Sequence, residues 1–170
     1  FRLGVRTVEL ERTSVAASDG SGMFAFCVNG KRIFAMGTNW VPADAFHSRD
    51  RKRLPELLPL LNDLGCNMVR CWGGNVYEHE DFFDFCDENG ILIWQDFAMG
   101  CAVYPQDDAF ADEIRREAEQ IVRKYRNHPA LALWAGDNEC DLACSWSGIG
   151  RDPNQNRLTR RVLPEVLRRL

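Results

Sequence analysis

The sequence LALWAGDNE, residues 131–139, decides the fold. An apolar run of strand length breaks at Gly136 and is followed directly by Asp137, Asn138 and Glu139. Such an unbroken apolar run is typical of a strand buried on both faces, as the strands of parallel sheets are. Parallel α/β folds keep their chemistry at the carboxyl ends of these strands. The stretch therefore predicts a buried parallel strand whose end carries polar side chains into a site.

Three further segments have the same design. Each is a short apolar run that ends on polar or aromatic residues: 33–36 before Asn39 and Trp40, 68–71 with Arg70 before Trp72 and Gly73-Gly74, and 91–94 before Gln95 and Asp96. Together the four ends predict one polar pocket at one edge of a sheet. This arrangement indicates an enzyme.

Helical patterns separate the four strands. Leucines recur at helical spacing from Leu54 to Leu64 before Gly65, and Pro59 is expected to kink or shorten that helix. Further helices are expected around 82–86, over 107–125 and over 158–170. Alternating strands and helices predict a parallel sheet with right-handed crossovers.

Two architectures fit this alternation. One is a (β/α)8 barrel, of which the chain would hold the first four βα units, and the other is a small doubly wound sheet. Gly73-Gly74 lacks the spacing of a glycine-rich phosphate loop, and no other strand is followed by one. The sequence therefore favours the α/β barrel.

The residues before the alternating strands and helices have a different sequence pattern. Residues 2–11 alternate apolar and polar side chains, which predicts an antiparallel strand with one wet face. Ser14 to Gly22 is expected to be a polar loop. Asn29-Gly30 lies between two apolar runs, 24–28 and 31–35, and this pattern predicts a tight β-hairpin.

Composition narrows the class of protein. The 170 residues suffice for one domain, and no apolar run approaches the roughly 20 residues of a membrane span. A formal charge of −4 with mixed signs favours no nucleic-acid partner. The seven cysteines show no metal-ligand spacing, so no metal or cofactor is expected and the thiols are expected to be reduced, most of them buried. Because the chain opens on Phe1, we expect a missing N-terminus and leave the compartment open.

Glu139 is the leading catalytic candidate. A half-buried carboxyl beside indole rings has a disfavoured charged form, which suits a general acid near neutral pH. Asn138 can hydrogen-bond a ligand hydroxyl, and Trp40, Trp72 and Trp146 can supply flat apolar walls. Aromatic faces with fixed amide and carboxylate groups suit a sugar ring, which offers both CH patches and hydroxyls.

Arg70 has a role that depends on burial. A buried arginine must be paired, so we expect a structural function in which it holds Asp96 or another carboxylate. Asp96 would either contact the substrate or only pair with Arg70, and the sequence leaves both open. His128 precedes Pro129 at a helix end and is expected to be structural.

Five motifs in order resemble the catalytic barrel of glycoside hydrolase family 2, and within it the β-mannosidase branch: GTNWVPAD, RCWGGNVYE, ILIWQDF, RNHPALALW and the Asn138-Glu139 pair. The resemblance implies a retaining exo-β-glycosidase that acts on a glycoside or oligosaccharide without a cofactor. It assigns the general acid/base to Glu139, contact with the sugar's 2-hydroxyl to Asn138, and a wall of the sugar subsite to Trp72. Trp40 and Trp146 fall close to further pocket positions of the family.

The resemblance also implies a division of the chain. Residues 1–22 would end an immunoglobulin-like domain and its linker, and residues 23–170 would form the N-terminal half of the barrel. The nucleophile is then expected beyond Leu170, so the chain alone should be inactive and should need the rest of its parent chain as partner.

Specificity stays open at this stage. Asp137 and Cys71 depart from the usual β-mannosidase pattern. A β-galactosidase, a β-glucuronidase or an exo-β-glucosaminidase of the same family remains an alternative. A carbohydrate-binding fragment without turnover is the alternative from another class.

Overall fold

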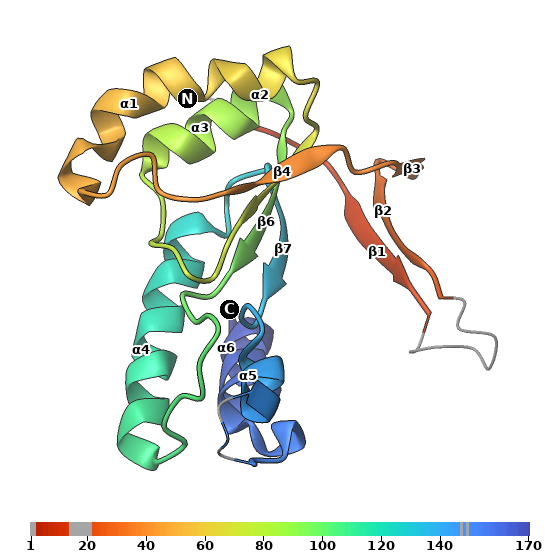
Figure 1. Cartoon of the computed structure of the whole chain (residues 1–170). Helices are drawn as coiled ribbons and strands as arrows, with labels where there is room; N and C mark the ends of the chain where they lie inside the picture. The colour runs from red at the N-terminus through yellow and green to blue at the C-terminus, as the bar shows by residue number, and fades with distance from the viewer. Residues whose placement is uncertain (1–2, 14–21, 147, 149) are drawn as a thin grey trace.

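The computed structural model describes residues 3–13, 22–146, 148 and 150–170 (Figure 1). Its larger sheet has four parallel strands in the order β4-β5-β6-β7. These strands are β4 (Gly37–Trp40), β5 (Met68–Cys71), β6 (Leu92–Asp96) and β7 (Leu131–Ala135). A doubly wound sheet reverses its strand order at a switch point, whereas these strands follow chain order as in a barrel. The predicted parallel α/β arrangement is confirmed.

A three-stranded antiparallel sheet precedes it. It consists of β1 (Val8–Arg12), β2 (Phe24–Val28) and β3 (Lys31–Ile33). Asn29 and Gly30 both have positive φ, 49° and 74°, which confirms the predicted tight hairpin between β2 and β3. Phe26 of this sheet packs against Met68 and Leu92, the first residues of two parallel strands. The predicted loop from Ser14 to Gly22 lies, except for its last residue, outside the described part of the chain.

The first parallel strand lies later than predicted. We expected it at 33–36, but the strand is Gly37–Trp40. The tight turn keeps Ile33 paired with Phe26 in the hairpin, so the parallel strand begins only after it. At Gly37 a Cβ would stand 1.9 Å from the Met68 carbonyl oxygen, so this close approach of two strands requires glycine.

Helices connect the parallel strands and follow them. They are η1 (His47–Arg49), α1 (Asp50–Leu57), α2 (Pro59–Asp63), α3 (Glu80–Asn89), α4 (Asp108–Tyr125), α5 (Cys140–Trp146), η2 (Pro153–Gln155), η3 (Leu158–Val162) and α6 (Leu163–Arg169). Pro59 begins α2 and so divides the predicted leucine-rich helix. The Asp107 side chain caps α4 by accepting a hydrogen bond from the Phe110 N–H at 2.9 Å. Of the helices that the structure describes, none is both long and apolar enough to cross a bilayer.

The core lies between the sheet and the helices. Helices α1, α2 and α3 lie together over one end of the molecule, and α4 runs beside α6 at the other (Figure 1). In the first region the Phe83 and Tyr125 rings stack with centroids 4.0 Å apart. His128 stands against the same pair, and its two ring nitrogens contact Asp87 and Glu80. These contacts agree with the structural role that we predicted for His128.

The N-terminal arm binds the far strand of the sheet. Arg6 donates hydrogen bonds to the carbonyl oxygens of Pro129 (2.9 Å) and Leu131 (2.5 Å). Gly4 lies so close to the Pro129 ring that a Cβ would stand 2.4 Å from its Cγ. The start of β7 is therefore held by residues more than a hundred positions earlier.

The parallel sheet has a free edge at β4 within the described residues, and apolar side chains accompany it. Phe34 is 81% exposed and Met36 is 52% exposed, both just before that strand. An unpaired strand edge with exposed apolar neighbours recruits other chains. The purified chain of residues 1–170 should therefore self-associate, and size-exclusion chromatography with light scattering measures this. A double Phe34→Lys/Met36→Lys variant should shift the population toward monomer, whereas a monomeric wild-type chain would contradict the expectation.

Candidate active site

The carboxyl ends of β5, β6 and β7 meet through their backbones. A Cβ on Gly73 would lie 2.3 Å from the Met99 carbonyl oxygen, so only glycine allows this contact. That oxygen accepts a hydrogen bond from the Asn138 N–H (3.0 Å), and the Asn138 carbonyl accepts one from the Cys101 N–H (2.8 Å). The loops after the three strands are therefore locked to one another before any side chain is considered.

Asp96 is the buried centre of this region. The residue is 1% exposed and carries a charge that burial makes unfavourable unless it is paired. Arg70 contacts it at 2.6 Å, the Gly73 N–H donates at 3.0 Å and the Trp94 indole N–H donates at 2.9 Å. The structure thus shows the predicted pairing with Arg70. A direct contact between Asp96 and substrate stays a prediction, and one that this burial disfavours.

Arg70 also fixes the side chain of Asn138. Its Nη2 also donates to the Asn138 Oδ1 at 2.9 Å, so one guanidinium joins the end of β6 to the end of β7. Arg70 also lines an open hollow of about 460 Å³ together with Asn39 of β4. The predicted residues Arg70, Asp96 and Asn138 therefore form one hydrogen-bonded group.

Glu139 differs from expectation in its burial. We predicted a half-buried carboxyl beside indole rings, but the residue is exposed. Its φ is 58°, in the left-handed region, so the backbone turns there and carries the side chain outward. The ring of Trp134 on β7 stacks instead on Phe97, with the ring centroids 5.1 Å apart. Glu139 lies in the loop after β7, as predicted, and its catalytic role stays a prediction.

The predicted tryptophans do not gather on one wall. Trp40 is 8% exposed and packs against Phe82, so it belongs to the core on the helix side of the sheet. Trp72 is half-buried and its ring covers Gly74, where a Cβ would stand 2.2 Å from a ring atom. Trp146 is 53% exposed at the end of α5. Their contacts with a substrate stay predictions.

Cys101 is a residue whose importance the sequence analysis missed. Free cysteines in such contexts were expected to be small buried hydrophobes, and five of the seven are buried while Cys66 is half-buried. Cys101 is exposed, and its sulfur lies 3.2 Å from the Asn138 Nδ2 and 3.6 Å from the Glu139 Oε2. The useful signal was its position, five residues past Asp96 in the loop after a strand with a polar end.

Glu78 is a second missed residue. It is 1% exposed, and its Oε1 accepts a hydrogen bond from the Trp40 indole N–H at 3.0 Å. Its other carboxyl oxygen has no hydrogen-bond partner among the described residues. Burial raises the pKa of Glu78 to about 7, partly offset by the Trp40 hydrogen bond; nearby Asp50 raises this pKa further and His47 lowers it. A neutral carboxyl therefore supports Trp40 at acidic pH.

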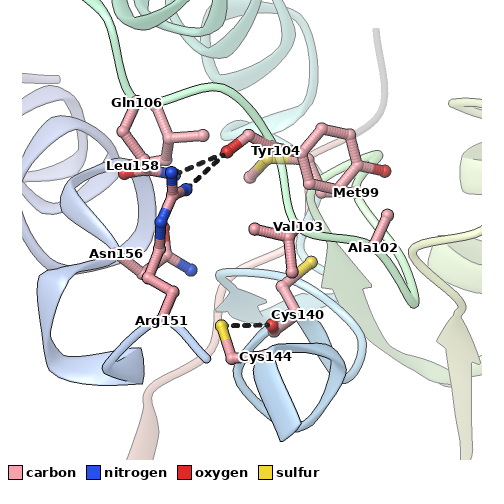
Figure 2. Close-up of a pocket in the computed structure, with 10 residues that line it drawn as sticks. All are labelled: Met99, Ala102, Val103, Tyr104, Gln106, Cys140, Cys144, Arg151, Asn156 and Leu158. Atoms are coloured by element: carbon pink, nitrogen blue, oxygen red, sulfur yellow. Dashed lines mark hydrogen bonds between the residues drawn. The ribbon is translucent and has the colours of Figure 1, made fainter. Parts of the chain in front are cut away.

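A small cavity lies behind the loop after β6 (Figure 2). Its volume is about 10 Å³, at the lower limit for a single water, so it is no sugar pocket. At its rim Arg151 donates to the Tyr104 carbonyl at 3.2 Å, and nearby the Arg157 N–H donates to the Gln106 side chain at 2.8 Å. These contacts anchor the loop that carries Cys101.

One group of potential metal ligands lies elsewhere in the described residues. Asp84, Asp87 and His128 have ligand atoms within 4.8 Å of one another. The Asp87 carboxylate is hydrogen-bonded to Nδ1 of His128 at 2.7 Å and accepts a hydrogen bond from the Ala130 N–H at 2.8 Å. The group braces the start of β7, away from the carboxyl ends of the strands.

The chain is similar to known glycosidases. Residues 22–163 match the family model described as glycosyl hydrolases family 2, TIM barrel domain. The chain is 45% identical over 141 residues to a β-mannosidase of Capra hircus and 43% identical over 139 residues to β-mannosidase B of Thermothelomyces thermophilus; each match covers 81% of this chain and 16% of the relative. The chain therefore spans about a sixth of the length of these relatives.

Solved structures give the same fold. The crystal structure of a β-D-mannosidase from Dictyoglomus thermophilum matches 99% of this chain and 21% of its own, with a TM-score of 0.89 and 38% identity. A β-glucuronidase of Parabacteroides merdae matches 83% of this chain and 16% of its own, with a TM-score of 0.68 and 26% identity. These matches confirm the predicted barrel fold and the resemblance on which it depends.

The Asp96 pairing predicts a large effect on stability. Asp96→Asn should lower the free energy of unfolding by about 3 kcal/mol, because Arg70 would lose its only charged partner among the described residues, in a partly buried site. The matched control is Asp81→Asn, which removes the exposed Arg51–Asp81 pair and should cost less than about 1 kcal/mol. Urea unfolding of both variants measures the difference, and equal effects would contradict a central role for Asp96.

The raised pKa of Glu78 predicts a pH-dependent stability. Because the folded protein prefers the neutral carboxyl, Glu78 stabilises it fully below the unfolded-state pKa near 4.5, and this contribution is lost as pH rises through about 7. Glu78→Gln should remove this dependence and make the protein more stable than wild type at pH 8, by up to roughly 3 kcal/mol. Urea unfolding at pH 5 and pH 8 tests this, with exposed Glu56→Gln as the control. A variant that loses stability equally at both pH values would contradict the expectation.

Proposed function

The chain belongs to glycosyl hydrolase family 2, and on this basis we propose that the protein containing it is a retaining exo-β-glycosidase that hydrolyses terminal β-mannosides. The single observation that carries the proposal is the Asn138-Glu139 pair at the end of β7, with the Asn138 amide fixed by Arg70. Support for the sugar comes from the relatives named β-mannosidase at 43–45% identity. The proposed substrate is a glycoside or an oligosaccharide with a terminal β-mannosyl unit.

Glu139 would act twice in this reaction. As an acid it protonates the leaving-group oxygen while a second carboxylate attacks the anomeric carbon and forms a glycosyl-enzyme. As a base it then takes a proton from the water that releases the sugar with retained configuration. Its exposed position at the strand end gives a leaving group and a water access to the carboxyl.

Asn138 and Trp72 would contact the sugar directly. Asn138 lies beside Glu139 and is held by a charged donor, so its remaining hydrogen-bonding capacity has a fixed direction toward the 2-hydroxyl. Trp72 would form a wall of the subsite. Trp40 would act from beneath, through the packing of the strand end, and Trp146 would border the opening.

We also propose how the chain is divided. Residues 1–22 would end an immunoglobulin-like domain and its linker, and residues 23–170 would form the N-terminal half of the barrel. The second carboxylate of a retaining enzyme stands roughly 5–5.5 Å from the acid/base. We assign it to a later strand outside residues 1–170, so this chain alone would not turn over substrate and would need the rest of the barrel.

β-Glucuronidase is the runner-up activity. A β-glucuronidase shares the fold at 26% identity, which is well below the identity to the β-mannosidases. A panel of aryl β-mannoside, β-glucuronide, β-galactoside and β-glucosaminide decides between them. A preference for any sugar other than mannose by more than tenfold in kcat/KM would contradict the specificity, while leaving the reaction type in place.

Replacement of Glu139 tests the reaction. In the full-length enzyme Glu139→Ala should lower kcat/KM on β-mannobiose by about 100-fold or more, because a poor leaving group needs the acid. With a dinitrophenyl β-mannoside, kcat/KM should change little, and azide should restore kcat by attacking the glycosyl-enzyme without a base.

Glu56→Ala, on the exposed face of α1, is the matched control and should behave as wild type. Wild-type kinetics of Glu139→Ala on mannobiose would exclude Glu139 as the acid/base.

A further inference from the structure

Two residues of the site have a backbone conformation that local sequence does not explain. Among the described residues, three non-glycine residues have positive φ: Asn29 (49°), Cys101 (53°) and Glu139 (58°). Asn29 belongs to the hairpin turn, where asparagine tolerates this conformation. Cys101 and Glu139 have no such turn chemistry, and a left-handed residue of this type is strained and persists only where the surrounding structure enforces it.

The surrounding structure does enforce it. Cys101 and Glu139 lie on different loops, yet the Cys101 N–H donates to the carbonyl of Asn138, the neighbour of Glu139, at 2.8 Å. An isolated parallel bridge between Gly100 and Asn138 joins the two loops beyond the ends of β6 and β7. Both left-handed residues are thus fixed side by side, with their side chains in contact.

The thiol of Cys101 connects the two proposed site residues. It accepts a hydrogen bond from the Asn138 Nδ2 (3.2 Å) and donates its own proton toward the Glu139 Oε2 (3.6 Å). Arg70 holds the opposite end of the same amide, at Oδ1. The amide therefore has one orientation, with its oxygen toward the guanidinium and its nitrogen toward the sulfur.

We propose that Cys101 is a positioning residue for the acid/base chemistry: its thiol fixes the Glu139 carboxyl relative to the Asn138 amide. The inference rests on the function proposed above. A group that delivers a proton must lie within hydrogen-bond reach of the leaving-group oxygen while the sugar is held in place. The sulfur sets this distance, because it contacts the group that holds the sugar and the group that donates the proton.

Sulfur suits this position better than oxygen. Contacts of 3.2 and 3.6 Å exceed the usual length of hydrogen bonds to a hydroxyl, so a serine oxygen would reach only one partner well. A thiol is also a weak donor, so it contacts the carboxyl without holding it in one strong hydrogen bond.

The Cys101 side chain contributes little to the anchoring of its own loop. The loop is held by the Arg151 contact to Tyr104 and by the Arg157 contacts to Gln106. The thiol itself is exposed. Removal of the sulfur should therefore change the chemistry and leave the folded loop in place.

The test compares Cys101→Ala and Cys101→Ser with wild type in the full-length enzyme. On β-mannobiose, Cys101→Ala should lower kcat/KM about tenfold, a part of the contribution of general acid catalysis. On the dinitrophenyl β-mannoside, kcat and KM should fall together while kcat/KM stays within about twofold, because the glycosyl-enzyme accumulates when base catalysis is impaired. Cys101→Ser should recover part of the loss.

The controls separate this proposal from the function that it assumes. Glu139→Ala, run in parallel, should show the same pattern more strongly; if it does not, the proposed function fails. If Glu139→Ala behaves as expected but Cys101→Ala has wild-type kinetics, or loses kcat/KM equally on both substrates, the role of Cys101 is refuted. Cys66→Ala is the matched cysteine control and should leave both substrates unaffected.

A second measurement modifies the thiol chemically. Methyl methanethiosulfonate should label Cys101 in the wild-type enzyme, replace the S–H donor by a methyl disulfide and lower turnover of mannobiose. Cys101→Ala should keep its residual activity under the same treatment. Stoichiometric labelling of Cys101 without loss of activity would overturn the proposal.

Discussion

The charge of Asp96 is the constraint on which the site depends. A buried carboxylate is tolerated only with donors around it, and the donors here come from three places: the Arg70 side chain, the Gly73 backbone and the Trp94 indole. Arg70 also donates to the side-chain oxygens of Asn39 and Asn138. The requirement to neutralise one charge thus fixes the ends of three strands relative to one another.

This electrostatic arrangement is possible because the backbones approach closely. Gly73 and Gly74 leave room for the loop after β6 and for the Trp72 ring, respectively. With side chains at these positions, the loops would separate and the hydrogen bonds from Asn138 and Cys101 could not form. Charge pairing and glycine therefore act together: the glycines permit the approach, and the ion pair selects one geometry within it.

Local patterns in the sequence predicted the strands 68–71 and 131–135 and the pairing of Arg70 with Asp96, because apolar runs and buried charges carry strong local rules. They misplaced β4, because Ile33 pairs with Phe26 in the preceding hairpin and is not available to the parallel strand. Trp40 pairs in register with Cys71, so alternation along the strand turns its ring toward the helices. Such register is a property of the sheet, not of the segment.

The roles of Cys101 and Glu78 were beyond sequence reasoning for a related reason. Cys101 and Glu78 act through contacts that span 37 or 38 positions, with Asn138 and Trp40. Backbone conformation at Cys101 and Glu139 is set by the loops that face them, and the residue types there give no hint of a left-handed φ. The positions of the strand ends could be predicted. The contacts between them could not, because they depend on hydrogen bonds between the loops that follow the strands.

The Arg6 contacts give the chain a particular order of assembly. Their acceptors, Pro129 and Leu131, stand 123 and 125 positions later, so these bonds close the longest loop in the described chain and carry the entropic cost of that closure. At roughly 5–20 residues per second, a ribosome exposes Arg6 several seconds to tens of seconds before it has made the partners. During that interval the N-terminal arm has no strand to bind, and the first βα units must fold on local contacts alone. The hydrogen bonds from Arg6 therefore form late, only after β7 has been synthesised.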